Sequence, residues 1–225
     1  MKNVFLIGTI LFFMASDCIC QTYSEDQRMV GGTFRNRSQT KGKPLGSPYQ
    51  QIMFASARVS NIPNPVYMRF NVFTDEFEFI TPKNDTLVAD KIETFSDITF
   101  TGSNTRYLLL PYTNHKNQLN NGYLMVIYQK GDYVLLKKEN IHFVEEKIAK
   151  TTLEMSMPAK YVKSADTYYL KYKDQITAAF CENKKALIKL YPDKKAATES
   201  FLKENKISFE EQSDMIKIVD FLVGL

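Results

Sequence analysis

The sequence has no tryptophan and three cysteines, of which only Cys181 lies beyond the first twenty residues. A chain left with one thiol has no internal disulfide, so its stability must come from packing. The preceding residues, Ala178-Ala179-Phe180, favour a small buried side chain at position 181 over a reactive thiol. The cysteine content therefore indicates neither a disulfide scaffold nor a redox centre.

The motifs that force a mechanism are also missing. The sequence contains no Gly-rich phosphate loop with its Lys-Ser/Thr, no paired histidines at metal-ligand spacing, no Gly-x-Ser-x-Gly elbow and no Cys-x-x-Cys pair. His115 lies in a polar loop and His142 near a strand end, where a solvated or locally hydrogen-bonded imidazole is the common case. We expect no cofactor, no metal site and a non-catalytic role.

Charge of one sign does not dominate the chain. The 29 basic and 25 acidic residues leave a net charge of +4, spread over the sequence. Nucleic-acid binding needs a concentrated basic stripe, so no nucleic-acid partner is expected. With 225 residues, 44% of them hydrophobic, the chain has enough material for one sizeable core.

The first twenty residues have the features of a signal peptide. Lys2 gives the positive start, residues 4–15 form an apolar run of twelve residues, and Cys18-Ile19-Cys20 precedes a cleavage site before Gln21. Twelve residues are too few to cross a bilayer, which needs about 20. We expect export to the periplasm or the outside of the cell, with no integral membrane span in the mature chain.

Lipidation is the less favoured alternative for this leader. A cysteine at the end of an apolar run can carry a lipid, but Asp17 precedes Cys18 and Ile19 precedes Cys20. Both replace the small residue usually found before a lipidated cysteine. The sequence therefore favours a cleaved leader over a lipid anchor.

Residues 21–48 are polar and rich in Gly, Ser, Arg and Lys, which predicts an N-terminal arm. Residues 49–180 predict an antiparallel β-domain of hairpins and a meander. Its clearest signal is Val66–Ile80, where apolar and polar residues alternate with the period of a half-buried strand. Thr74-Asp75 interrupts the alternation, and Glu76–Phe79 resumes it with acids on one face and aromatics on the other, as in a returning strand.

A second hairpin is predicted around Lys130-Gly131-Asp132, with strands over 123–129 and 133–138. Residues 141–157 fit either a loop or a weak helix, and further strands are expected over 160–163, 167–172 and 175–180.

Residues 181–225 change to helical spacing. Ser208 and Glu211 match a capping box, in which the serine hydroxyl accepts from the backbone N–H of Glu211. An apolar stripe follows at Met215, Ile218, Val219 and Leu222. We expect helices packed on the sheet, and hence an α+β fold; a partner-binding amphipathic helix is the alternative.

Three segments resemble small exported proteins of Bacteroidota whose function is not established. They are GSPY followed by YMRFNVFTDEFEF, then YLMVIYQKGDYVLLKK, and the tail from KKALIKLYPDKK to MIKIVDFL. The resemblance implies a bacterial envelope setting and supplies no catalytic residues.

The best candidate site is the acidic group Asp75, Glu76 and Glu78. Two carboxylates on one strand face can act as an acid/base pair or bind a hard cation, although a solvated face beside a turn, with Arg69 or Lys83 as neighbours, is more common.

Tyr67 and Phe73 extend this candidate ligand-binding surface. Such aromatics line faces that bind sugars or peptides, and they also serve as cross-strand packing pairs. The favoured function is a non-catalytic exported envelope protein that acts as a binding or assembly module, with an envelope protein as a possible partner. The alternatives are a small-ligand carrier and a hydrolase using Glu76 and Glu78.

Overall fold

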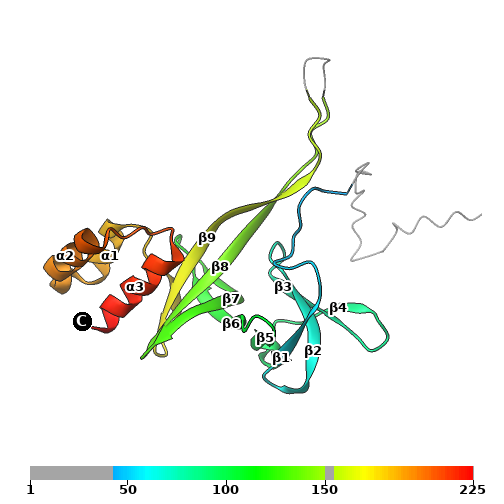
Figure 1. Ribbon diagram of the computed structural model, residues 1–225, viewed down its shortest axis with the longest axis horizontal. Helices are drawn as coiled ribbons and strands as arrows, with labels where there is room; N and C mark the ends of the chain where they lie inside the picture. Colours follow the sequence, from blue (N-terminus) through cyan, green and yellow to red (C-terminus); the bar gives the residue numbers. More distant parts are fainter. Residues whose placement is uncertain (1–42, 150–154, 225) are drawn as a thin grey trace, which may run out of the picture. The chain divides into compact units, whose positions relative to one another are not determined.

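The computed structural model describes residues 43–149 and 155–224. The predicted leader and almost all of the predicted arm lie outside the described residues. The α+β class, with a mainly antiparallel sheet and C-terminal helices, is confirmed (Figure 1). The strands are β1 (Ala55–Val59), β2 (Ile62–Asn71), β3 (Glu76–Ile80), β4 (Thr86–Val88), β5 (Asp97–Phe100), β6 (Arg106–Thr113), β7 (Leu119–Lys130), β8 (Tyr133–Val144), β9 (Lys160–Tyr172) and β10 (Thr177–Ala179). The helices are η1 (Glu93–Phe95), α1 (Lys184–Leu190), η2 (Pro192–Lys194), α2 (Lys195–Asn205) and α3 (Gln212–Val223).

The strands form one ten-stranded sheet in the order β10-β9-β8-β7-β6-β5-β1-β2-β3-β4. Neighbours in this order are antiparallel. The short strand β10 also pairs with β6, in parallel, so strands β6 to β10 close into a ring of backbone pairings. Strands β1 to β5 continue the sheet outward from β6.

The predicted central hairpin is present and has the predicted faces. In β2, Met68 and Phe70 are buried while Tyr67 is 61% exposed. The turn places Asp75 at a φ of 58°, and Arg69 then lies opposite Glu78 in the register. Strict alternation with one apolar face fixed this register, because a slip of one residue would turn the apolar set toward water.

The apolar face of this hairpin packs on β5, β6 and β7 around an aromatic group. The ring centroids of Phe70 and Phe77 are 4.8 Å apart, and Phe77 lies 4.7 Å from Tyr123 and 5.3 Å from Tyr107. Tilted and edge-on aromatic pairs at these distances contribute about 0.5–1.5 kcal/mol each beyond their buried area. This cluster anchors β1–β3 to the rest of the sheet.

Two further clusters complete the core. Inside the ring, Leu124, Leu136, Tyr112 and Tyr169 pack together. On the other face of β8 and β9, the helices cover Leu135 and Tyr168 with Cys181, Leu187, Met215, Ile218, Val219 and Leu222. The apolar stripe of α3 is therefore buried against the sheet.

Cys181 is 6% exposed, as the sequence predicted for a small buried residue. Burial raises the pKa of its thiol to about 12. Within the described residues, no helix has the length and apolar character needed to cross a membrane.

The structure differs from the sequence prediction in three places. In the ambiguous segment 141–157, residues 141–144 are strand because β8 continues to Val144 and pairs with β9, residues 145–149 and 155–157 lie outside the helices and strands, and residues 150–154 lie outside the described residues. The strands expected over 160–163 and 167–172 are one unbroken strand, β9. The predicted capping box is replaced by another contact: α3 begins at Gln212, and it is Asp214 that accepts from the Ser208 backbone N–H, at 2.9 Å. Both positions satisfy the same requirement, a carboxylate reaching back to a free N–H before the helix.

Candidate functional site

Glu78, one of the predicted site residues, is held by an arginine fork on the outer face of β2 and β3. Arg69 donates to Glu78 Oε2 from Nε at 2.8 Å and from Nη2 at 2.6 Å. The Tyr49 hydroxyl donates to Glu78 Oε1 at 3.0 Å, and burial together with this hydrogen bond raises the pKa of Tyr49. Rings of Tyr49 and Phe54 lie 3.8 and 4.4 Å from the Arg69 guanidinium carbon. The carboxylate is thus engaged on all sides by side chains of the chain itself.

Glu76 and Tyr67 share this outer face but make no such contacts. Glu76 is half-buried opposite Asn71 in the register, and it makes no side-chain hydrogen bond to a described residue. Tyr67 points to solvent from the middle of β2. Glu76 and Glu78 lie on one face, as predicted, and Arg69 binds the carboxylate of Glu78. A hydrolase that uses these two glutamates as an acid/base pair stays a prediction.

Asp75 belongs to a different cluster, which links the β2–β3 turn to the ring of strands. Its two carboxylate oxygens accept from Lys91 Nζ at 2.7 Å and Lys138 Nζ at 2.8 Å, and Oδ1 also accepts from the Tyr123 backbone N–H at 3.3 Å. A Cβ at Gly122 would collide with Asp75 Oδ2, which explains why glycine stands there. With two lysines on one carboxylate, the cluster is a structural tie and not an open cation site.

Phe73 joins a third cluster. Its ring lies 5.5 Å from that of Tyr161 on β9, and Phe143 on β8 lies 5.0 Å from Tyr161. The segment before β1 passes beside these rings, where Tyr161 donates its backbone N–H to Leu45 at 2.9 Å. Glu78, Asp75 and Phe73 therefore lie in three separate clusters, while Glu76 and Tyr67 belong to none of them, and the structure does not bring the five predicted residues into one site.

The β8–β9 hairpin extends as a two-stranded ribbon beyond the point where β7 stops pairing with β8 (Figure 1). Strand β7 pairs with β8 only as far as Lys137, whereas β9 pairs with it as far as Val144. Two backbone hydrogen bonds of 2.8 Å between Lys147 and Met157 prolong the ribbon beyond the strands. Along residues 138–144, the edge of β8 away from β9 has no paired strand among the described residues.

The end of this ribbon carries large apolar side chains that are open to solvent. We call residues 143–149 and 155–161 the ribbon end. The exposed fractions are 36% for Phe143, 69% for Ile148, 86% for Met155 and 51% for Met157. A gathering of large exposed apolar side chains on one element is typical of an interaction surface.

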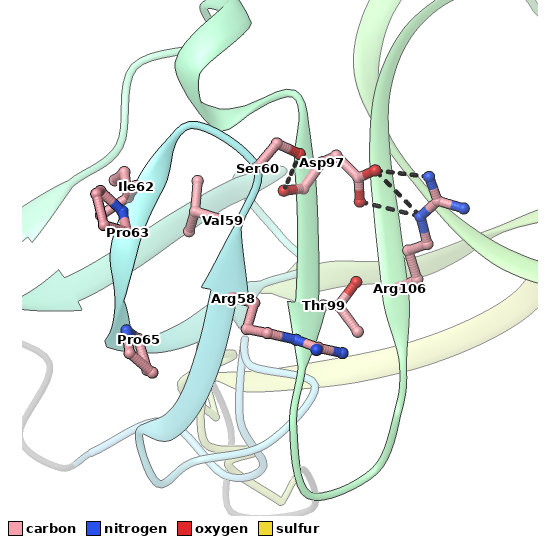
Figure 2. A pocket seen from close by; sticks show the side chains of 9 residues that line it. All are labelled: Arg58, Val59, Ser60, Ile62, Pro63, Pro65, Asp97, Thr99 and Arg106. Carbon is pink, nitrogen blue, oxygen red and sulfur yellow. Dashed lines mark hydrogen bonds and ion pairs between the residues drawn. The ribbon is translucent and has the colours of Figure 1, made fainter.

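A hollow of about 490 Å³ lies elsewhere, on the outer face of β1, β2, β5 and β6 (Figure 2). Its floor is formed by three residues that are paired across neighbouring strands. Arg58 on β1 lies opposite Thr99 on β5, and Thr99 lies opposite Arg106 on β6. Two prolines of β2 form the far wall. The lining residues are Arg58, Val59, Ser60, Ile62, Pro63, Pro65, Asp97, Thr99 and Arg106.

The two arginines of this hollow differ in their partners. Arg106 donates to Asp97 from Nε at 3.0 Å and from Nη2 at 2.6 Å, and these hydrogen bonds raise the pKa of Arg106 above its ordinary value. Its Nη1 makes no hydrogen bond to a described residue. Arg58 is exposed, and it makes no ion pair or side-chain hydrogen bond to a described residue; Figure 2 shows it extending toward β5 beside Thr99.

Sequence reasoning missed Arg58, Thr99 and Arg106. Each stands at an outward position of a strand, so alternation alone could have placed each on a surface. Their meeting depends on β1 pairing with β5 and β5 with β6, over sequence separations that no local pattern specifies.

Comparison of the chain with protein-family models, with curated proteins and with solved structures finds no match. In the described part of the chain, no group of three or more His, Cys, Asp or Glu side chains is arranged to hold a metal ion.

Proposed function

We propose that this protein is a non-catalytic, exported binding or assembly module, whose ribbon end packs against an apolar, extended segment of a protein in the bacterial envelope. The observation that carries the proposal is the ribbon end, where Ile148, Met155 and Met157 are each at least half exposed. Burying such side chains against a partner removes apolar surface from water, which is the main driving force of protein association.

The ribbon also offers backbone groups to a partner. Among the described residues, 138–144 of β8 pair on one side only, and an unpaired strand edge is a ready template for an added strand. Strand addition gives affinity through main-chain hydrogen bonds, while neighbouring apolar side chains give specificity. The ribbon end has both, so an extended apolar segment suits it better than a helix.

Export is the part of the proposal that rests on sequence. The signal-peptide features of residues 1–20 support it: a positive start, an apolar run of twelve residues and a cleavage site before Gln21. The mature protein is expected to begin at Gln21, which mass spectrometry of the protein purified from the cells that produce it will test.

A photo-crosslinking experiment tests the partner. A photoreactive phenylalanine analogue replaces Met157 in one tagged chain and Leu87, 49% exposed on β4, in the other. Both are expressed in the cells that naturally produce the protein. We expect one protein to be attached at position 157 and not at position 87, and the purified partner to bind the purified chain.

Two matched triple variants then distinguish specific binding at the ribbon end from nonspecific binding to exposed apolar side chains. The triple variant Ile148→Ser, Met155→Ser, Met157→Ser should weaken binding of the purified partner at least about tenfold, because interface hot spots contribute about 2 kcal/mol or more each. The control Leu87→Ser, Val88→Ser, Ile92→Ser changes three apolar side chains that are each about half exposed and should bind as the wild type does. Equal binding by both triple variants, or no attachment at position 157, would contradict the proposal.

A further inference from the structure

The hollow on the outer face of β1, β2, β5 and β6 has the composition of a small-ligand site. Its volume of about 490 Å³ lies within the range of known ligand pockets, about 300–1,000 Å³. One wall carries the apolar rings of Pro63 and Pro65, and the other carries the polar groups of Arg58, Thr99 and Arg106. A ligand that fits must therefore combine a polar end and an apolar body.

The polar end of the hollow attracts an anion. It contains two guanidinium groups and one carboxylate, so its formal charge is positive by one. Asp97 occupies only the edge of Arg106 that carries Nε and Nη2, so Nη1 of Arg106 and the whole Arg58 guanidinium have no partner among the described residues. Hydrogen bonds from arginine to an oxyanion are charge-assisted and roughly twice as strong as neutral ones.

The number and spacing of the donors select the kind of anion. Arg58, Thr99 and Arg106 stand on three consecutive strands, so the two arginine Cα atoms are about 10 Å apart at the usual strand spacing. Arg58 extends toward Thr99, whereas the Arg106 guanidinium is turned to Asp97 (Figure 2), so Arg106 must swing its free Nη1 inward to share one anion with Arg58 above the Thr99 hydroxyl. A tetrahedral group offers three terminal oxygens to these three donors, whereas a carboxylate offers two.

We propose that this pocket binds a phosphate or sulfate monoester, with its oxygens on Arg58, Thr99 and Arg106 and its organic body on Pro63 and Pro65. The pocket lies on different strands from the ribbon end, so the site is independent of the protein partner proposed above. Asp97 fixes the Arg106 side chain and limits the positive charge of the site.

Isothermal titration calorimetry on the full chain tests the ligand class. Phenyl phosphate, phenyl sulfate, benzoate and inorganic phosphate are titrated under one buffer and salt condition. We expect saturable binding of a phenyl ester at one site, with inorganic phosphate at least about fivefold weaker because it leaves the proline wall uncovered. Tighter binding of benzoate than of either ester would overturn the assignment.

Variants identify the pocket as the place of binding. Arg58→Gln removes an exposed donor that contacts no described partner, so the fold should be retained, and we expect about tenfold weaker binding of the phenyl ester. Thr99→Val should weaken it about threefold. Lys83→Gln, a change of the same charge in an exposed turn, should leave the affinity unchanged; a loss equal to that of Arg58→Gln would show nonspecific attraction and overturn the site.

A vesicle flotation experiment tests whether the phosphate belongs to a soluble ester or to a lipid headgroup. Flotation with phosphatidylcholine vesicles, with and without phosphatidic acid, is compared for the wild type and Arg58→Gln. Flotation that needs both phosphatidic acid and Arg58 assigns the phosphate to a membrane lipid, and saturation by phenyl phosphate without flotation assigns it to a soluble ester. Neither flotation nor saturation would refute the proposal.

Discussion

Two arginine–carboxylate pairs on the outer face of this sheet have nearly the same hydrogen bonds and different surroundings. Arg69 and Arg106 both present Nε and Nη2 to a carboxylate, with Nη2 to oxygen distances of 2.6 Å in each case. The side chains of Arg69 and Glu78 are 19% and 13% exposed, whereas those of Arg106 and Asp97 are 43% and 28% exposed. The difference lies in what covers each pair.

The Arg69 pair is covered by the segment before β1, which places Tyr49 and Phe54 on the guanidinium. No described residue covers the Arg106 pair in this way, and a second arginine lines the same hollow. A covered pair serves the fold, because its charges are held away from water and must stay together. An open pair contributes little to stability and is free to meet a ligand.

Breaking the covered pair should have the largest effect on stability. Glu78→Gln keeps the shape but removes the charge that Arg69 and Tyr49 face, and we expect a loss of about 2–3 kcal/mol in the free energy of unfolding. Asp97→Asn makes the same change in the open pair and should cost less than about 1 kcal/mol. Urea unfolding of both variants measures the difference, and equal losses would show that the cover does not matter.

Burial also makes the free energy of unfolding depend on pH, through the Cys181 thiol. The pKa of Cys181 is raised to about 12 in the folded protein, so the folded state keeps a proton that the unfolded thiol loses near its ordinary pKa of about 8.5. Stability from this group is complete below about pH 8 and is lost as the pH rises toward 12, by about 2 kcal/mol at pH 10. Urea unfolding at pH 8 and pH 10 measures the loss. Cys181→Ala should remove this share of the loss, while Tyr123 and Tyr169, whose pKa values burial raises to about 12, keep their smaller share; an unchanged slope would contradict the assignment.

Loosening the cover should have a smaller effect. Gly46 sits at a φ of 77°, and a Cβ there would lie 2.7 Å from the Tyr161 carbonyl oxygen. Gly46→Ala should therefore displace the covering segment and cost about 1–2 kcal/mol, from the left-handed backbone and the clash. Gly102→Ala, where nothing lies within 4 Å, is the matched control and should change stability by less than about 0.5 kcal/mol in the same urea assay.

The smallest expected effect concerns ligand binding at the open Arg106 pair. Asp97→Asn removes a negative charge beside the proposed anion site and releases two nitrogens of Arg106. Binding of phenyl phosphate should tighten by about two- to fivefold, the range that fits an exposed charge pair. Calorimetry on the variant and the wild type gives the ratio, and weaker binding would mean that Asp97 is needed to position the arginine.

The two pairs also differ in how far the sequence predicts them. The alternation in Val66–Ile80 predicted the hairpin and its faces, and a turn at Thr74-Asp75 places Arg69 opposite Glu78, so Arg69 was foreseen as a neighbour of the acids. The cover was not foreseen, because Tyr49 lies 29 residues from Glu78. Tyr49 and Phe54 stand in residues 49–54, where apolar and polar residues do not alternate, so the pattern gives no sign of where this segment packs.

Long-range pairing explains the other omissions. The partners of Asp75, Lys91 and Lys138, are 16 and 63 residues away, so a turn aspartate could not be distinguished from a structural tie. The ribbon was missed because β8 beyond Lys137 has β9 as its one partner strand in the described part of the chain and lacks the alternation of a half-buried strand. The arginine pocket needed the register of three strands at once.

The most direct test of the contrast between the two pairs is an NMR titration that observes the arginine Nε–Hε groups of the full chain as phenyl phosphate is added. We expect the signals of Arg58 and Arg106 to shift along one saturation curve while that of Arg69 stays in place. A shift of Arg69 equal to the others, or shifts that never saturate, would contradict the view that one pair is closed for the fold and the other open for a ligand.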